Sequence, residues 1–424
     1  MISPESGNIV RSNELEHKIS ADVVIVGGGP AGIYLADVMN RKVGSRGSVL
    51  LLEQQREFGG CAPASLQQFR TMQGHPSLVN LVGDTVQWYQ ELSSELHLGK
   101  EDLIERFPYI FLARDEDQLR KHTSNLAGVN QAGFGKGAEI INSSDIKKRF
   151  PFIDGELAGA LYYPDAGRLD FDKVITHITK NSPNATFALE TAMKKVIITK
   201  EEVSGVETNN GFISTRNVVL CPGPFLLSAP DQVIEGKLLL NGDMNSIIQV
   251  RKRQRFAAAV NGLPAGTNVY IISPEGAYVR LRTDKSGKGE GIYGYADPDD
   301  PQLGPHNIVT KPKANELEFP AIVYDALSRS ISSYGDEPKA SQPNLAVRPV
   351  GRIAGYYVDT PDDRPIISKT AVKGLYILSA FSHMGVMAGH GAAKRMGDII
   401  TDSKTDPNPF SLDRTYTGGE GIKL

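Results

Sequence analysis

Residues 21–32 read ADVVIVGGGPAG, and this stretch decides the fold of the chain. The apolar or small residues from Val23 to Gly27 are typical of a strand buried on both faces, as in the centre of a parallel sheet. Gly27, Gly29 and Gly32 follow with the spacing G-x-G-x-x-G. In such a turn the first glycine allows the sharp bend, the second lets backbone approach a pyrophosphate, and the third lets the next helix pack on the sheet. The stretch predicts a nucleotide-binding strand, turn and helix.

The residues after this turn support the same prediction. Pro30 and Ala31 stand where the predicted helix, about 31–41, begins, and its N-terminus offers N–H groups to phosphates. A second apolar strand over 48–52 leads directly into Glu53 and Gln54. Glu53 lies 21 residues after Gly32, where a carboxylate accepts hydrogen bonds from a ribose diol. A dinucleotide is therefore expected here.

The composition limits the partners of the chain. Its 424 residues predict about two or three domains. The net charge of −3 argues against nucleic acid or an anionic membrane as the main partner, and no run approaches the roughly 20 apolar residues of a membrane span. Residues 1–20 lack the apolar core of a secretory signal and are predicted to be a loosely held arm. Two cysteines cannot form a disulfide framework, so a cytoplasmic location is expected.

Two stretches rich in small residues mark further places where backbone can approach a ligand. The segment 58–69 reads FGGCAPASLQQF and leads to Arg70. A strand near 211–220 ends in Cys-Pro-Gly at Gly223. Both stretches are turn-rich and follow apolar strands, which is typical of loops at a ligand site.

Two arginine-bearing strands are also predicted. Alternation over 278–282 places Tyr278, Arg280 and Arg282 on one strand face. The run RKRQRF at 251–256 also alternates, and it is interpreted as solvated charge or charge that protects a sheet edge.

A strand-to-helix junction recurs near the C-terminus, where a buried strand over 374–380 precedes a helix that starts near Val386. Two such junctions far apart in sequence predict one discontinuous nucleotide-binding domain. The β-rich middle of the chain is then an insertion that caps the cofactor.

Seven stretches together resemble the D-amino-acid oxidase/sarcosine oxidase (DAO) family of FAD-dependent oxidoreductases. Besides GGGPAG with Glu53, they are GGCAPASLQQFR (59–70), GALYYPDAGRLDFDKV (159–174), NVVLCPGPF (217–225), GAYVRLR (276–282), GYYVDTPDDRPII (355–367) and GLYILSAFSHMGVMAG (374–389). Gln67 and Gln68 depart from the family pattern, which usually has small residues there.

The resemblance implies an α/β fold, an FAD-binding Rossmann-like domain of the glutathione-reductase type with an inserted, β-rich antiparallel substrate domain. The expected boundaries are an arm at 1–20, the FAD-binding domain at 21–100, 168–228 and 345–410, the substrate domain at 101–167 and 229–344, and a tail at 411–424.

The resemblance also implies which residues bind FAD. The glycine turn would hold the pyrophosphate, Glu53 the ribose, the backbone at Val196 the adenine, and the turn before the last helix the flavin N1/C2 carbonyl edge. The implied FAD-binding residues are Gly27, Gly29, Pro30, Ala31, Gly32, Glu53, Gln54, Gly60, Cys61, Ala64, Ser65, Val196, Gly223, Arg352, His383, Met384, Gly385, Val386 and Met387.

In this family a small amine or amino acid transfers hydride to flavin N5. A substrate carboxylate suits an arginine fork, so Arg280, with Tyr278 beside it, and Arg70 are the candidates. His383 is a candidate for hydrogen bonding to flavin or substrate. No metal site is expected, since no ligand set completes a pair of histidines.

Two departures from the family shape the prediction. Several sarcosine oxidases hold the flavin covalently through a cysteine near the TPD or C-terminal region. No cysteine lies beyond Cys221 here, so FAD is expected to be non-covalent unless a histidine attaches it. The segment 291–295 (GIYGY) has no lysine for oxygen activation, which favours a dehydrogenase that passes electrons to a quinone or protein over an oxidase that uses oxygen. Two alternatives remain open: oxidation of a 2-hydroxy acid or glycerol 3-phosphate with His383 as base, and a non-catalytic FAD-binding subunit.

Overall fold

The computed structural model describes residues 8–11, 20–97, 103–131, 133–227, 247–296, 301–314, 318–335, 345, 348–402 and 408–416. The helices are α1 (Pro30–Lys42), α2 (Pro76–Glu95), α3 (Glu116–Gln131), α4 (Ser143–Arg149), α5 (Phe171–Asn181), α8 (Phe319–Ser328) and α9 (Gly385–Ile400), with short 3-10 helices η2 (Ala62–Ala64), η3 (Gly223–Leu227), η4 (Pro305–Asn307) and η5 (Ser332–Tyr334). The strands are β1 (Ile9–Arg11), β2 (Val23–Val26), β3 (Val49–Leu52), β4 (Gln68–Arg70), β5 (Ile104–Arg106), β6 (Tyr109–Ala113), β7 (Glu139–Asn142), β8 (Gly159–Tyr163), β9 (Ala166–Leu169), β10 (Ala185–Leu189), β11 (Met193–Thr199), β12 (Glu202–Thr208), β13 (Gly211–Ser214), β14 (Val218–Leu220), β15 (Gln249–Val260), β16 (Asn268–Ile272), β17 (Ala277–Thr283), β18 (Gly289–Tyr295), β19 (Gly351–Asp359), β20 (Ile366–Lys369) and β21 (Leu375–Ser379).

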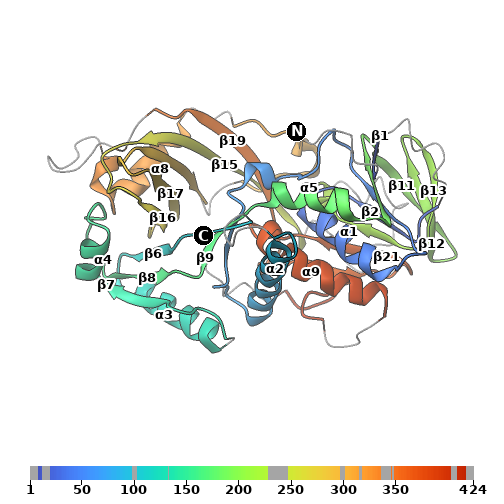
Figure 1. Cartoon of the computed structure of the whole chain (residues 1–424), viewed down its shortest axis with the longest axis horizontal. Helices are drawn as coiled ribbons and strands as arrows, with labels where there is room; N and C mark the ends of the chain where they lie inside the picture. Colours follow the sequence, from blue (N-terminus) through green and yellow to red (C-terminus); the bar gives the residue numbers. More distant parts are fainter. Residues whose placement is uncertain are drawn as a thin grey trace.

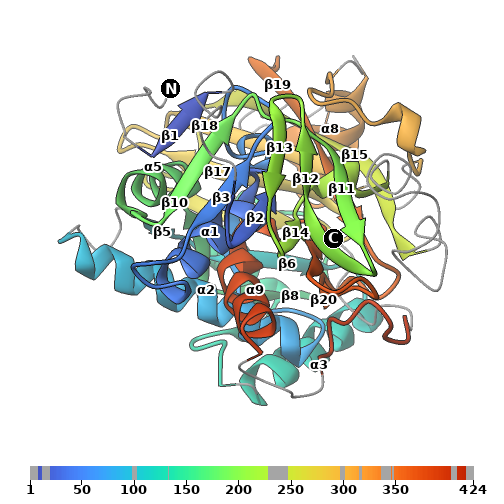
Figure 2. The ribbon, with the colours of Figure 1, turned by 90° about the vertical axis from the view of Figure 1, so that its right-hand side faces the viewer.

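A seven-stranded sheet carries the glycine turn. Its order is β1-β10-β3-β2-β14-β21-β20, and only the β20–β21 pair is antiparallel. Strand β2 is buried on both faces: Val23 and Ile25 pack against α1, α5 and α9, whereas Val24 and Val26 pack toward the meander β11-β12-β13. Figures 1 and 2 show these helices and the meander beside the sheet. Strands from both ends of the chain thus join one sheet.

An eight-stranded sheet, β19-β15-β18-β17-β16-β6-β8-β7, forms the other half of the molecule, at the opposite end from β11–β13 in Figure 1. The predicted alternation in β17 is confirmed, since Val279 and Leu281 enter a core with α8 while Tyr278 lies against the cluster on the other face. A small sheet β4-β9-β5 adds β4, which follows the 58–69 segment. Among the described helices, none is long and apolar enough to cross a membrane.

Three predicted boundaries need correction. Residues 9–11 of the expected arm form β1, because their backbone pairs in parallel with β10 and Ile9 is buried; residues 1–7 and 12–19 lie outside the described residues. Strand β19, expected in the FAD-binding domain, pairs along its length with β15 of the eight-stranded sheet. The first part of the expected tail, up to residue 416, belongs to the fold, and its Leu412 is buried. Residues 417–424 are outside the described part.

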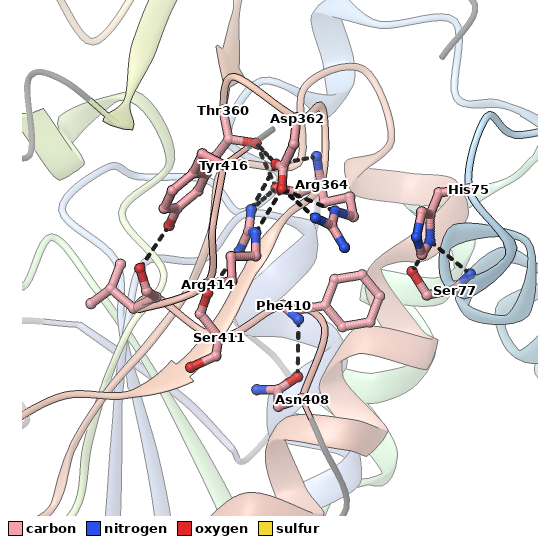
Figure 3. Close-up of polar contacts among 11 residues, drawn as sticks. His75, Ser77, Thr360, Asp362, Arg364, Asn408, Phe410, Ser411, Arg414 and Tyr416 are labelled. Atoms are coloured by element: carbon pink, nitrogen blue, oxygen red, sulfur yellow. Dashed lines mark hydrogen bonds and ion pairs between the residues drawn. The ribbon is translucent and has the colours of Figure 1, made fainter. Parts of the chain in front are cut away.

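A buried ion cluster fastens residues 408–416 to the turn before β20. Asp362 accepts hydrogen bonds from Arg364 Nε at 2.9 Å and from Arg414 Nε at 2.8 Å, and Thr360 donates to the same carboxylate at 2.9 Å. Figure 3 shows both arginines directed at Asp362. The Asn408 side-chain amide also donates to the Ile367 carbonyl at 2.6 Å. The segment therefore closes over the edge of the seven-stranded sheet.

Asp362→Asn is expected to destabilise the fold. Burial alone would raise the pKa of Asp362, but the hydrogen bonds and charge of Arg414 outweigh it and lower the pKa from 3.8 to about 2. A depressed carboxyl pKa stabilises the folded state above the ordinary pKa, and this stabilisation is lost as pH falls from about 4 to 2. We expect a loss of about 1 to 2 kcal/mol of unfolding free energy at pH 7, after solvent screening is allowed for.

Urea unfolding at pH 7 and pH 3 measures this loss. Asp325→Asn is the matched control, because Asp325 pairs with Arg329 on the surface and its side chain is 72% exposed. Two results would contradict the interpretation. One is an equal loss of unfolding free energy in Asp362→Asn and Asp325→Asn, and the other is a loss in Asp362→Asn that is as large at pH 3 as at pH 7.

Candidate functional site

A cavity of about 960 Å³ lies between the two large sheets and is lined by residues of both. The part against the seven-stranded sheet holds the glycine turn, Glu53 and the N-termini of α1 and α9. The other part, here called the arginine end, is formed by Gln68, Arg70, Tyr109, Arg253, Tyr270, Tyr278, Tyr357 and His383.

The three glycines of the turn do different things. Gly27 has φ +112°, and a Cβ there would collide with the Cys221 carbonyl oxygen. A Cβ on Gly32 would collide with the Gly27 carbonyl oxygen, so this glycine lets α1 pack on the sheet. A Cβ on Gly29 would meet only the Gly60 Cα at 3.9 Å. Gly27 and Gly32 are therefore required by the fold, whereas Gly29 leaves space for a ligand.

Glu53 is held at the end of β3 by backbone donors. Its Oε2 accepts from Gly28 N at 2.8 Å and its Oε1 accepts from Gln55 N at 2.8 Å. Burial raises the pKa of Glu53, and these backbone hydrogen bonds oppose the rise. The side chain lines the cavity, as a ribose-binding carboxylate must.

Two helices begin at the cavity without a side-chain cap. Neither Gly29 at the start of α1 nor Met384 at the start of α9 provides a side-chain acceptor, and Ala31 and Val386 of their first turns line the cavity. Free N–H groups and the positive helix end favour negative charge there. Ala380 and Ser382 adopt left-handed φ values of 58° and 52° just before α9, which concentrates backbone strain at the cavity. These features fit a dinucleotide with its pyrophosphate at α1.

Arg70 is the central group of the arginine end. Its side chain is buried, with 3% of the residue exposed, and no carboxylate of the described residues pairs with it. Its Nη2 donates to His383 Nε2 at 3.3 Å, and its Nε has no hydrogen-bond partner among the described residues. Burial lowers the pKa of Arg70, and the surrounding tyrosines oppose the fall.

His383 is a neutral hydrogen-bond acceptor. Because Arg70 has only donors, Nε2 must be the unprotonated nitrogen, and Nδ1–H then donates to Ser382 Oγ at 3.2 Å. Burial and the charges of Arg70 and Arg253 lower the pKa of His383 to about 3. The imidazole therefore stays neutral at physiological pH.

Four tyrosines form the walls around Arg70. Tyr109 and Tyr270 are 4.3 Å apart between ring centroids, and Tyr270 and Tyr278 are 5.5 Å apart. Tyr357 is 6.0 Å from the His383 ring. Burial raises the pKa of each of these tyrosines, so all four stay neutral. A small molecule here would meet aromatic faces, neutral hydroxyls and a guanidinium.

The structure corrects the interpretation of the 251–256 run. β15 is an inner strand of the eight-stranded sheet: it pairs with β19 over residues 249–257 and with β18 from Arg255 onward. Arg253 lies over the Tyr357 ring at 5.5 Å and lines the cavity. Arg255 Nε donates to the Ala64 carbonyl at 2.7 Å and holds the 58–69 segment in place. The alternation of this run places its arginines on one face of the strand, but the sequence does not show whether that face meets solvent or the cavity.

Most of the predicted site residues line the cavity. They are Gly27, Gly29, Pro30, Ala31, Glu53, Gln54, Gly60, Cys61, Ala64, Ser65, Arg70, Gly223, Tyr278, His383, Gly385, Val386 and Met387. Gln68, Tyr109, Tyr270, Arg253 and Tyr357 line it without having been predicted, because their positions depend on how the two sheets face each other.

Five predicted residues lie outside the lining. Arg280 pairs with Glu105 at 2.6 Å and stacks on Phe107 at 4.3 Å, so its charge is already matched. The others are Gly32, packed against the turn; Val196, in the core beneath the sheet; Arg352, exposed on β19; and Met384, buried before α9.

Comparisons with known proteins agree with this geometry. A family model described as DAO, FAD dependent oxidoreductase, matches residues 22–399. The mitochondrial pyruvate dehydrogenase phosphatase regulatory subunit of Mus musculus is 24% identical over 401 residues, which cover 93% of this chain and 43% of that protein. The chain thus spans less than half the length of that relative.

Solved structures share the fold. L-proline dehydrogenase from P. horikoshii has a TM-score of 0.72 and 21% identity, over 92% of this chain and 95% of that one. Glycine oxidase from Bacillus cereus has a TM-score of 0.68 and 17% identity, over 91% and 96%. L-amino acid deaminase from Proteus myxofaciens has a TM-score of 0.69 and 20% identity, over 93% of each chain. The predicted fold class is confirmed by these likenesses.

Gly29→Ala is expected to separate folding from cofactor binding. The added methyl group fits the protein but occupies the space that a pyrophosphate would fill, so we expect FAD affinity to fall about 10-fold or more while the melting temperature of the cofactor-free protein changes little. Gly27→Ala is the contrast, because its Cβ collides with backbone and should prevent folding. Fluorescence titration with FAD and thermal melting measure both effects; normal FAD binding by Gly29→Ala would contradict this assignment.

Proposed function

The chain belongs to the DAO family of FAD-dependent oxidoreductases, and we propose that it oxidises the C–N bond of a small amino acid or amine. The substrate class we propose is that of D-amino acids, glycine or sarcosine, or proline. Bound FAD would supply the hydride acceptor, its N5 atom. The protein would supply binding, orientation and the exclusion of water.

The observation that carries this proposal is the buried, unneutralised charge of Arg70. A buried guanidinium without a carboxylate partner is costly, and an anionic ligand removes that cost. Arginine matches a carboxylate through parallel N–H donors. Arg70 lines the cavity and Arg280 does not, so we assign the substrate carboxylate to Arg70, with Tyr278 and Tyr357 as walls of the pocket.

His383 helps to distinguish amine from alcohol oxidation. Alcohol oxidation needs a base for the hydroxyl proton, but His383 Nε2 already accepts from Arg70 and its pKa is lowered to about 3. An amine that arrives neutral needs no such base. We therefore favour amine or amino-acid oxidation over oxidation of a 2-hydroxy acid or glycerol 3-phosphate.

We further propose non-covalent FAD and a dehydrogenase reaction. Cys61 lines the cavity, but burial raises its thiol pKa and disfavours the nucleophilic thiolate. Strand β18 carries no lysine. The electron acceptor would be a quinone or a protein, with oxygen as the alternative.

A non-catalytic FAD-binding subunit is the second candidate. It is favoured by the curated mouse relative, which is named a regulatory subunit and covers 93% of this chain. This candidate predicts bound FAD that no small substrate reduces.

Anaerobic bleaching of the flavin absorption tests the proposal. The FAD-loaded protein is mixed with amino acids, N-methyl amines and 2-hydroxy acids. Bleaching by an amino acid or amine, followed by slow reoxidation in air, is expected. Bleaching by hydroxy acids alone would contradict the C–N assignment, and no bleaching would support the non-catalytic subunit.

Arg70→Gln is expected to weaken amino-acid binding. Loss of a buried charged hydrogen bond costs about 2 to 5 kcal/mol, so the KM for the amino acid that bleaches the flavin should rise about 30-fold or more. Arg280→Gln is the matched control, because Arg280 lies outside the lining. Steady-state kinetics with both variants measure this difference, and a larger KM effect in Arg280→Gln would reverse the assignment.

His383→Gln is expected to retain amine oxidation. Glutamine can still accept from Arg70, and His383 is neutral well above pH 3, so the acid limb of kcat/KM between pH 5 and 8 should not move. A catalytic base would instead contribute about 100- to 10,000-fold. Stopped-flow rates of flavin reduction across this pH range measure the effect; a loss of that size would favour the hydroxy-acid alternative.

A further inference from the structure

Gln68 and Arg70 face the cavity together. They are the first and third residues of β4, so they share one strand face, while Phe69 between them enters the core of the seven-stranded sheet. Gln68 is 8% exposed and Arg70 is 3% exposed, and both line the cavity. Two side chains with hydrogen-bond donors are thus buried side by side on one cavity wall.

Tyr109 sets the orientation of the Gln68 amide. The Tyr109 hydroxyl lies 2.9 Å from Gln68 Oε1, and an amide oxygen can only accept a hydrogen bond. Tyr109 therefore donates to Gln68 Oε1. This leaves Gln68 Nε2, a donor, without a hydrogen-bond partner among the described residues.

The orphaned donors of Gln68 and Arg70 call for an acceptor from outside the chain. A buried donor without a partner is costly, and among the described residues neither Gln68 Nε2 nor Arg70 Nε has one. Both side chains project from the same face of β4, two residues apart, and both line the cavity. A carboxylate has two oxygens that can each accept from a separate donor.

We propose that Gln68 determines specificity by binding, together with Arg70, the carboxylate of the substrate, so that the site selects amino acids over simple amines. This inference rests on the proposed function. A substrate without a carboxylate would leave both donors unpaired, which is the condition under which a polar site rejects an analogue most strongly. It also assigns a role to one of the two glutamines that depart from the family pattern.

Gln67 is a built-in comparison. Its Nε2 donates to Asp172 at 3.2 Å, and its Oε1 accepts from Arg168 at 3.0 Å and from Phe171 N at 3.2 Å. Gln67 Oε1 and Nε2 therefore both have partners within the protein, whereas Gln68 Nε2 has none among the described residues.

Acetate titration of the FAD-loaded protein tests the inference without turnover, with the flavin absorption as the readout. Gln68→Met removes the donor and should raise the Kd for acetate about 10-fold. Gln68→Glu places a negative charge beside Arg70 and should raise it about 100-fold or more. Gln67→Met deletes an amide whose Oε1 and Nε2 both have partners in the protein. It should therefore lower the melting temperature and leave the Kd for acetate within about 2-fold.

Two results would overturn the inference. One is an unchanged Kd for acetate in Gln68→Met and Gln68→Glu with normal melting temperatures. The other is a shifted flavin spectrum in ligand-free Gln68→Met with an unchanged Kd, which would assign the amide to the cofactor. The ratio of kcat/KM for an amino acid to that for its decarboxylated amine should also fall about 10-fold in Gln68→Met.

The proposed function fails separately from this inference. If no amino acid bleaches the wild-type flavin, the proposed function is wrong, whatever the acetate titration gives. If amino acids bleach it and Gln68→Met keeps the wild-type preference over amines, only the role of Gln68 is wrong.

Discussion

The close approach of three backbone segments is the constraint on which the rest of the structure depends. Gly27 lies against the Cys221 carbonyl and Gly32 lies against the Gly27 carbonyl, with no room for a side chain at either contact. These contacts fix the ends of β2 and β14 relative to α1, and so fix where the free N–H groups of α1 point. The N-terminus of α9 then meets the same cavity because β21 pairs with β14. Backbone packing alone therefore determines the position of the part of the cavity against the seven-stranded sheet.

The arginine end depends on electrostatics instead. Tyrosines and a neutral histidine surround the buried Arg70. They reduce the free-energy cost of burying its guanidinium, but they do not neutralise its charge. Arg280, by contrast, carries its own counter-ion in Glu105. Of two buried arginines at similar depth, the one without a carboxylate retains an attraction for an anion. This difference between the two side chains determines at which end of the cavity an anionic group is expected to bind.

The sequence predicted the parts of the site that are local in the chain and missed those that depend on tertiary contacts. Gly27, Glu53 and the turn before α9 each follow directly from a strand and a spacing, so motif and burial pattern sufficed. The sequence could not separate Arg280 from Arg70, because alternation defines a strand face but not what covers it. Glu105, from a distant segment, covers Arg280. The tyrosine walls come from four separate strands. Pairing of β6, β16 and β17 brings three of them together, and β19, with Tyr357, joins through β15 and β18.

The parallel sheet has a consequence for how the protein is made. β14 pairs with β2 on one side and with β21 on the other, and β21 is synthesised more than 150 residues later than β14. The ion cluster around Asp362 further requires Arg414. Domains fold as units when their whole chain is present, so the early strands wait with unpaired edges until residues near 416 leave the ribosome. The edge of β14 that receives β21 therefore stays unpaired until β21 has been synthesised.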